Sequence, residues 1–143
     1  MLIPSNLSII DLGSCESYID ASCPSKKVHL PNKIEFDFKN GRNTFFASKN
    51  YFTGQRLTRR DDIIQIVYNL LYLTQPINFE MSDIFLEAEN PYMAMGKYKG
   101  EKTPEEICAD PRAQYLIPLL KEAYSIGYDE EPQYGRIIFI MEL

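Results

Sequence analysis

The segment that decides the fold is LTRRDDIIQIVYNLLYL, residues 57–73. Its apolar residues occupy nearly every face of a 3.6-residue period, which predicts a helix from Asp61 to Leu73. A helix that is apolar all round belongs in the middle of a core. Thr58, Asp61 and Asp62 stand at its start, where side-chain oxygens cap free N–H groups and negative charge is favourable. The sequence therefore predicts a buried central helix.

Further helices are predicted downstream. TPEE at residues 103–106 has the form of a capping box with Pro at the first helical position, and it predicts a short helix to about Cys108. Asp110 and Pro111 repeat the start signal for a helix that Gly127 should stop. Pro118 lies inside it and should bend it or shift its start. The same apolar spacing predicts a last helix that carries Tyr134, Ile137, Ile138 and Met141.

The N-terminal part is different in character. The apolar run at residues 7–10 ends at Asp11-Leu12-Gly13, a pattern typical of a strand that enters a turn. Residues 14–56 mix Pro and Gly with short aromatic pieces and are too long for a plain loop in a compact domain. The expected fold is therefore mainly α: one short strand region, then helices packed around the central helix.

Composition excludes several classes of protein. With 143 residues, 45% hydrophobic and 24% charged, the chain has the balance of one ordinary globular domain. The net charge of −5 argues against binding to nucleic acid or to an anionic membrane. No apolar run approaches the roughly 20 residues that cross a bilayer, and the first residues lack the features of a signal peptide. We expect a cytoplasmic or nuclear protein whose three cysteines are reduced thiols.

Five blocks, in order along nearly the whole chain, resemble the casein kinase 1 family of serine/threonine protein kinases. That family has an Asp-x-Gly turn after a strand, a closing motif of the form Ala-Ser-x-Asn, and a buried helix that opens with Ser-Arg-Arg-Asp-Asp. The stretch 74–101 matches the family poorly. The five blocks are DLG (11–13), ASKN (47–50), TRRDD (58–62), KTPEEIC (102–108) and AYSIGYDEEPQYGRI (123–137).

The resemblance implies a protein-kinase-like C-terminal lobe. Residues 1–13 would form the strand and turn, 14–56 the activation segment, and 57–143 the helical subdomain. Asp11 would fall on the magnesium-binding position, with Gly13 beside it at the Mg-ATP site, because phosphoryl transfer needs a metal that neutralises phosphate charge. The alternative is that Asp11 is only a turn residue after a strand.

Structural roles are implied for the central helix as well. Asp62 would match the carboxylate that accepts hydrogen bonds from the backbone of the catalytic loop, and it would also serve as a helix-start carboxylate. Arg59 and Arg60 would tie the activation segment to the lobe. The alternative for these two arginines is a solvated basic pair.

An anion site is a further candidate. In the family, an activation-segment Arg and basic residues after the buried helix bind a phosphate already present on the substrate. That Arg would fall near Phe45, which cannot do this. Whether other basic residues rebuild the site, or are plain solvated charges, stays open. The candidates are Arg42, Lys97, Lys99 and Lys102.

A kinase carries its Gly-rich loop, its Lys–Glu pair and its His-Arg-Asp loop before the Asp-x-Gly turn. This sequence starts after all of them, so we expect the chain alone to be inactive and to bind no Mg-ATP. One hypothesis is a fragment of a kinase that phosphorylates protein Ser or Thr. The other is a short pseudokinase that serves as a binding or structural module, with a protein partner over the surface of the absent lobe and catalytic loop. An unrelated helical protein would require five ordered matches by accident.

Overall fold

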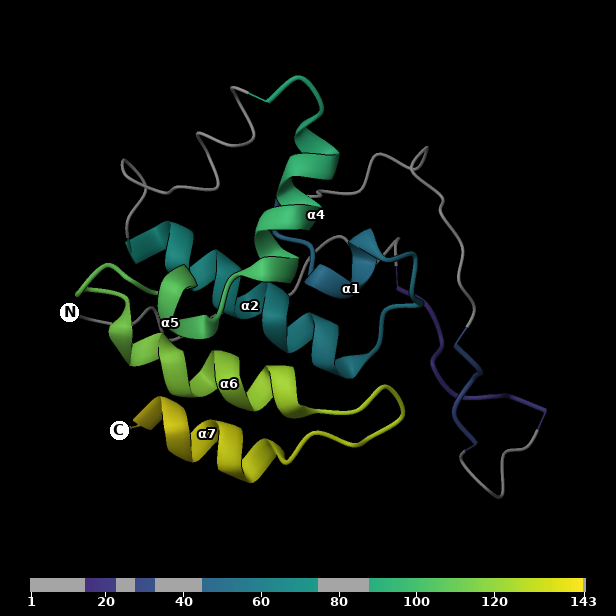
Figure 1. The fold of residues 1–143 in the computed structure, drawn as a ribbon. Helices are drawn as coiled ribbons and strands as arrows, with labels where there is room; N and C mark the ends of the chain where they lie inside the picture. Colours follow the sequence, from purple (N-terminus) through teal and green to yellow (C-terminus); the bar gives the residue numbers. More distant parts are fainter. Residues whose placement is uncertain (1–14, 23–27, 33–44, 75–87, 143) are drawn as a thin grey trace. The chain divides into compact units, whose positions relative to one another are not determined.

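The computed structural model of the chain describes residues 15–22, 28–32, 45–74 and 88–142 (Figure 1). The chain divides into two units, residues 1–31 and residues 32–143. The strand predicted at residues 7–10 lies outside the described residues.

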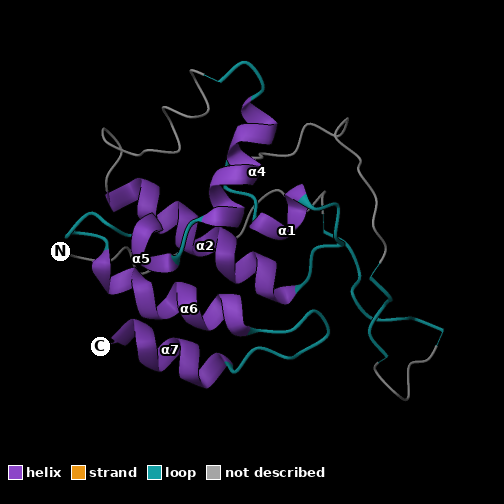
Figure 2. Ribbon diagram, viewed as in Figure 1, coloured by secondary structure: helices purple, strands orange, loops and turns teal. Residues whose placement is uncertain are grey.

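In the first unit, two short pieces of chain pair in antiparallel fashion. Ile19 and His29 form an isolated bridge. The Asp20 N–H donates to the Val28 carbonyl and the Leu30 N–H donates to the Tyr18 carbonyl, both at 2.8 Å. This pairing is the one strand-like feature among the residues that the structure describes (Figure 2).

The second unit is built of helices, so the expectation of a mainly helical chain is confirmed for the described residues. None of the helices described is long and apolar enough to cross a bilayer. The elements are α1 (Lys49–Phe52), α2 (Arg59–Thr74), α4 (Pro91–Glu101), α5 (Pro104–Ile107), a 3₁₀ turn (Gln114–Leu116), α6 (Ile117–Ser125) and α7 (Tyr134–Glu142).

Helix α2 forms the centre of the core, and α6 packs along it (Figure 1). Val67 and Leu71 are fully buried, as the apolar pattern predicts. The prediction that α2 is buried on every face is wrong, because the side chains of Ile66 and Leu73 are 52% and 72% exposed. The helices described here pack on the side of Val67 and Leu71, and apolar content alone does not decide which faces of a helix other elements cover. The residues packed with α2 include Met95, Cys108, Leu116, Leu119, Leu120 and Ala123.

The capping box at residues 103–106 is confirmed. The Glu106 N–H donates to the Thr103 hydroxyl at 3.3 Å, and the Thr103 N–H donates to the Glu106 carboxylate at 2.8 Å. These bonds satisfy free donors at the start of α5. The helix ends at Ile107, one residue before the expected end.

Pro118 shifts the start of its helix. It lies within the first two residues of α6, where a missing N–H costs no helical hydrogen bond. The chain before it, from Asp110, forms turns and a 3₁₀ piece instead of the predicted α-helix. The end of α6 at Ser125 agrees with the stop signal at Gly127.

The last helix, α7, is also confirmed, but its apolar residues do not all face the core. Ile137 is buried, whereas Ile138 is 56% and Met141 58% exposed. Helix α7 packs against α6 on one side (Figure 1). The second row of apolar residues is therefore left at the surface of the described part of the chain.

Helix α4 was not predicted, although its start has a local signal. The Asn90 side chain accepts a hydrogen bond from the Met93 N–H at 3.1 Å, and Pro91 follows at the first helical position. Gly96 brings α4 close to α1: a Cβ at this position would lie 2.9 Å from the Cβ of Phe52. The sequence needs glycine there because the two helices touch.

This contact gives a first testable prediction. Replacing Gly96 with Ala should lower the free energy of unfolding by about 1–2 kcal/mol, because overpacking outweighs the better helix propensity of Ala. Replacing Gly100 is the matched control in the same helix, since nothing lies within 4 Å of its Cβ position. That change should be neutral or stabilising by up to about 1 kcal/mol. Urea denaturation followed by circular dichroism measures both, and equal effects would contradict the close approach.

Candidate functional site

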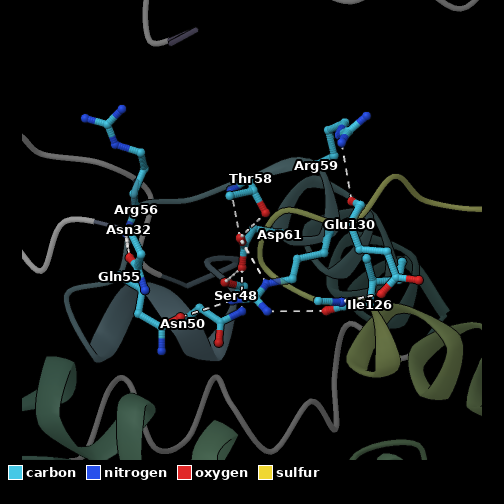
Figure 3. Close-up of polar contacts among 12 residues, drawn as sticks. Asn32, Ser48, Asn50, Gln55, Arg56, Thr58, Arg59, Asp61, Ile126 and Glu130 are labelled. Atoms are coloured by element: carbon cyan, nitrogen blue, oxygen red, sulfur yellow. Dashed lines mark hydrogen bonds and ion pairs between the residues drawn. The ribbon is translucent and has the colours of Figure 1, made fainter. Parts of the chain in front are cut away.

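The polar centre of the second unit is the Asp61 carboxylate at the start of α2 (Figure 3). Asp61 is fully buried. One of its oxygens accepts hydrogen bonds from the Ser48 hydroxyl at 2.5 Å and from the Asn50 side-chain amide at 2.8 Å. The other accepts the Thr58 N–H at 2.8 Å. These bonds satisfy a buried charge and join α1 to α2.

The neighbouring Asp62 is exposed. Although the residue is exposed, its carboxylate is partly shielded from water, and this desolvation raises the pKa of Asp62. The charge of Asp61 raises it further. Among the described residues, none donates a hydrogen bond to its carboxylate. Its role in holding a catalytic loop therefore stays a prediction, whereas the carboxylate that organises the described structure is Asp61, one residue earlier.

Arg60 connects the start of α2 to two other segments. Its guanidinium donates to the Gln55 side chain at 3.0 Å and to the Ile126 carbonyl at 3.3 Å. Gln55 lies in the stretch predicted to be the activation segment, and Ile126 follows α6. Its Nε lies 3.8 Å from the Asp61 carboxylate. The geometry agrees with a side chain that ties this stretch to the helical body.

Arg59 contacts the connection between α6 and α7. It donates to the Glu130 carbonyl at 3.4 Å and lies 3.6 Å from the Glu131 carboxylate. Figure 3 shows Arg59 and Glu130 on one side of the Asp61 network, and Arg56 with Asn32 on the other. The two neighbouring arginines thus connect different parts of the chain to α2, and neither is a solvated charge.

The basic residues of the candidate anion site do not form one surface cluster. Lys97 is exposed, whereas Lys99 on the same helix is fully buried. Lys102, which follows α4, lies over the ring of Tyr98 at 5.7 Å. Lys99 therefore does not belong to a basic surface cluster with Lys97 and Lys102. Its side chain lies on the core face of α4, and its ammonium donates inward to the Phe45 and Ala47 carbonyls.

The remaining predicted positions are Asp11, Gly13 and Arg42, and all three lie outside the described residues. Whether Asp11 and Gly13 fit a metal and a nucleotide is thus not tested by this geometry. In the described ranges, no group of three metal-binding side chains (His, Cys, Asp or Glu) comes together.

Buried titratable groups surround the core end of α4. The Tyr68 and Tyr124 hydroxyls share a hydrogen bond of 2.7 Å, and burial raises the pKa of both phenols. Burial raises the pKa of the free Cys108 thiol, and the negative charge of Glu105 adds to this effect, so that the pKa is about 11. This thiol is therefore protonated and unreactive near neutral pH.

Sequence reasoning missed the roles of Ser48, Asn50 and Lys99. Ser48 and Asn50 belong to the ASKN block, so the block itself was the signal, but it does not say which carboxylate they would meet. Lys99 had no distinguishing signal, because Lys97 and Lys102 are the same type of residue and sit nearby. Only the direction of α4 relative to the core separates them.

Comparison with known proteins supports a distant relation to protein kinases. No family model matches the chain. Casein kinase I homolog 3 of Saccharomyces cerevisiae is 25% identical over 143 residues. The alignment covers 97% of this chain and 26% of the yeast protein, so the chain spans about a quarter of the length of this relative.

The two neighbouring aspartates give the second prediction. Replacing Asp61 with Asn should lower the free energy of unfolding by about 3 kcal/mol, because the amide offers one acceptor in place of a charged pair and leaves a buried donor against Ser48 or Thr58. Replacing Asp62 with Asn is the matched control. It should leave stability unchanged or slightly raised at neutral pH, because a raised folded pKa means that the ionised form is disfavoured in the folded state.

Urea denaturation at pH 7 measures both variants. A loss for Asp62→Asn as large as that for Asp61→Asn would contradict the assignment of the structural carboxylate.

Proposed function

We propose that this chain is the helical part of a casein-kinase-1-like serine/threonine protein kinase domain. The activity of the whole domain would be ATP-dependent phosphorylation of Ser and Thr in proteins. The observation that carries the proposal is the Asp61 network, because its hydrogen bonds join the ASKN block to the TRRDD block. The similarity to the yeast casein kinase homolog over 97% of the chain supports the same assignment.

In this proposal the described residues supply structure and the transfer of phosphate needs further parts. Asp62 would hold the backbone of a catalytic loop, and its exposed carboxylate, which no described residue bonds, is available for that contact. Asp11 and Gly13 would face Mg-ATP, where the metal neutralises phosphate charge. The Gly-rich loop, the Lys–Glu pair and the His-Arg-Asp loop would come from outside these 143 residues, so the isolated chain is expected to be inactive.

A second candidate is a pseudokinase that acts as a protein-binding or structural module. It is favoured by the exposed apolar residues of α7, where Ile138, Phe139 and Met141 are each more than half exposed. Exposed apolar groups that lie together are typical of surfaces that bind other proteins. In this case a protein partner would cover these residues of α7.

The third prediction separates the two candidates. The native polypeptide that contains these residues, isolated from its source and sized by intact mass, should be longer and should transfer phosphate from Mg-ATP to a Ser-containing protein. Replacing Asp11 with Asn in it should lower the rate at least about 100-fold, because the metal loses a ligand. Replacing Asp110 with Asn, an aspartate of the helical part whose side chain bonds Arg112, should leave the rate unchanged.

The isolated 143-residue chain should show no micromolar affinity for Mg-ATP in calorimetry. Absence of phosphate transfer from a native polypeptide that carries all the missing parts would contradict the kinase proposal. A native product of these residues alone, bound to a stoichiometric partner, would support the second candidate instead.

A further inference from the structure

Lys99 is a fully buried lysine in the core of the second unit. Its ammonium donates to the Phe45 carbonyl at 2.7 Å and to the Ala47 carbonyl at 2.6 Å. These carbonyls belong to the segment that leads into α1, more than fifty residues earlier in the chain. One side chain of α4 thus holds the backbone of a distant segment.

Two aromatic rings also contact the ammonium. Its nitrogen lies 4.5 Å from the centre of the Tyr68 ring of α2 and 5.3 Å from that of the Phe52 ring of α1. Ring faces attract cations, and more strongly where water is excluded. The Lys99 nitrogen is therefore the point where the entering segment, α1, α2 and α4 meet.

The buried phenols and the thiol near Lys99 stay protonated near neutral pH. On α2, burial raises the pKa of Tyr68 well above its usual value, and its hydroxyl bonds Tyr124 of α6. Cys108, after α5, has a pKa of about 11 because it is buried. The Lys49 nitrogen of α1 lies 4.0 Å from the centre of the Tyr124 ring, and burial, then the charge of Arg60, lowers its pKa. The segment itself presents backbone carbonyls.

Burial lowers the pKa of the fully buried Lys99 to about 7. A lysine that is exposed to water has a pKa of about 10.4. Between these two values, a state with Lys99 released to solvent binds more protons than the state with Lys99 buried. Raising the pH therefore favours the buried contact, and lowering the pH favours release, where water solvates the full charge.

We propose that Lys99 is a proton-sensitive latch that holds residues 45–47 on α4, and that uptake of a proton by Lys99 loosens this segment while α2 and α6 stay packed. The latch goes beyond the proposed kinase relation and does not depend on it. It assigns a conformational role to the segment that leads into α1, and it names the proton as the ligand that controls it.

The test is hydrogen exchange of the full 143-residue chain, measured by mass spectrometry and corrected for the intrinsic pH dependence of exchange. Protection of peptides that span residues 45–52 should rise about tenfold per pH unit above pH ~7, up to the limit set by global unfolding. Peptides from α6 should change less. In Lys99→Met the protection of residues 45–52 should lose this pH dependence, and in Lys97→Met, the matched exposed control on α4, it should keep it.

A flat profile in the unchanged chain, or the same slope in Lys99→Met, would overturn the latch. A second measurement does not depend on the variant being folded. In the unchanged chain labelled with ¹³C at lysine Cε, one lysine signal should titrate near pH ~7, at a lower pH than every other lysine signal. If every lysine signal titrates above pH ~9, the proposal is wrong.

Discussion

The second unit depends on one buried carboxylate. Asp61 is removed from water, and a charge in that position is tolerated only when hydrogen bonds replace those lost from solvent. Donors from two directions do this: the side chains of Ser48, just before α1, and Asn50 of α1, and the backbone N–H and hydroxyl of Thr58, just before α2. Because each donor is specific in position, the carboxylate fixes how α1 and the start of α2 lie against each other. The apolar core then fills the remaining space around α2.

A buried lysine holds the same short stretch. Lys99 bonds the carbonyls of Phe45 and Ala47, and Asp61 bonds the side chains of Ser48 and Asn50. Residues 45–50 are thus fixed through backbone acceptors at one end and through side-chain donors at the other. The two attachments differ in kind, because the Asp61 contacts come from several residues whereas the Lys99 contacts come from one side chain. A segment attached in this way can be loosened at its Lys99 end while its Asp61 end stays fixed.

Local signals in the sequence predicted local structure well. The capping box at residues 103–106, the shift caused by Pro118 and the existence of α2 follow from hydrogen bonding and backbone geometry within a few residues. The failures concern which side of an element is covered. Asp61 and Asp62 are adjacent residues of the same type, and Lys97 and Lys99 are two lysines of the same helix. In each pair one residue is buried and the other is exposed. Residue type and spacing do not contain this information, because it depends on how distant segments pack.

Substitutions in the apolar core and in the Asp61 network differ in cost. A buried apolar residue can be exchanged for another of similar volume at small cost, so most of a core can change while the fold persists. A buried carboxylate with several donors has no such substitute, because any neutral replacement leaves donors without an acceptor. Substitutions in the apolar core around α2 should therefore be tolerated more readily than substitutions of Asp61 and its partners Ser48 and Asn50. Lys99 lies outside the ASKN and TRRDD blocks, and its contacts depend on how α4 packs against residues 45–47.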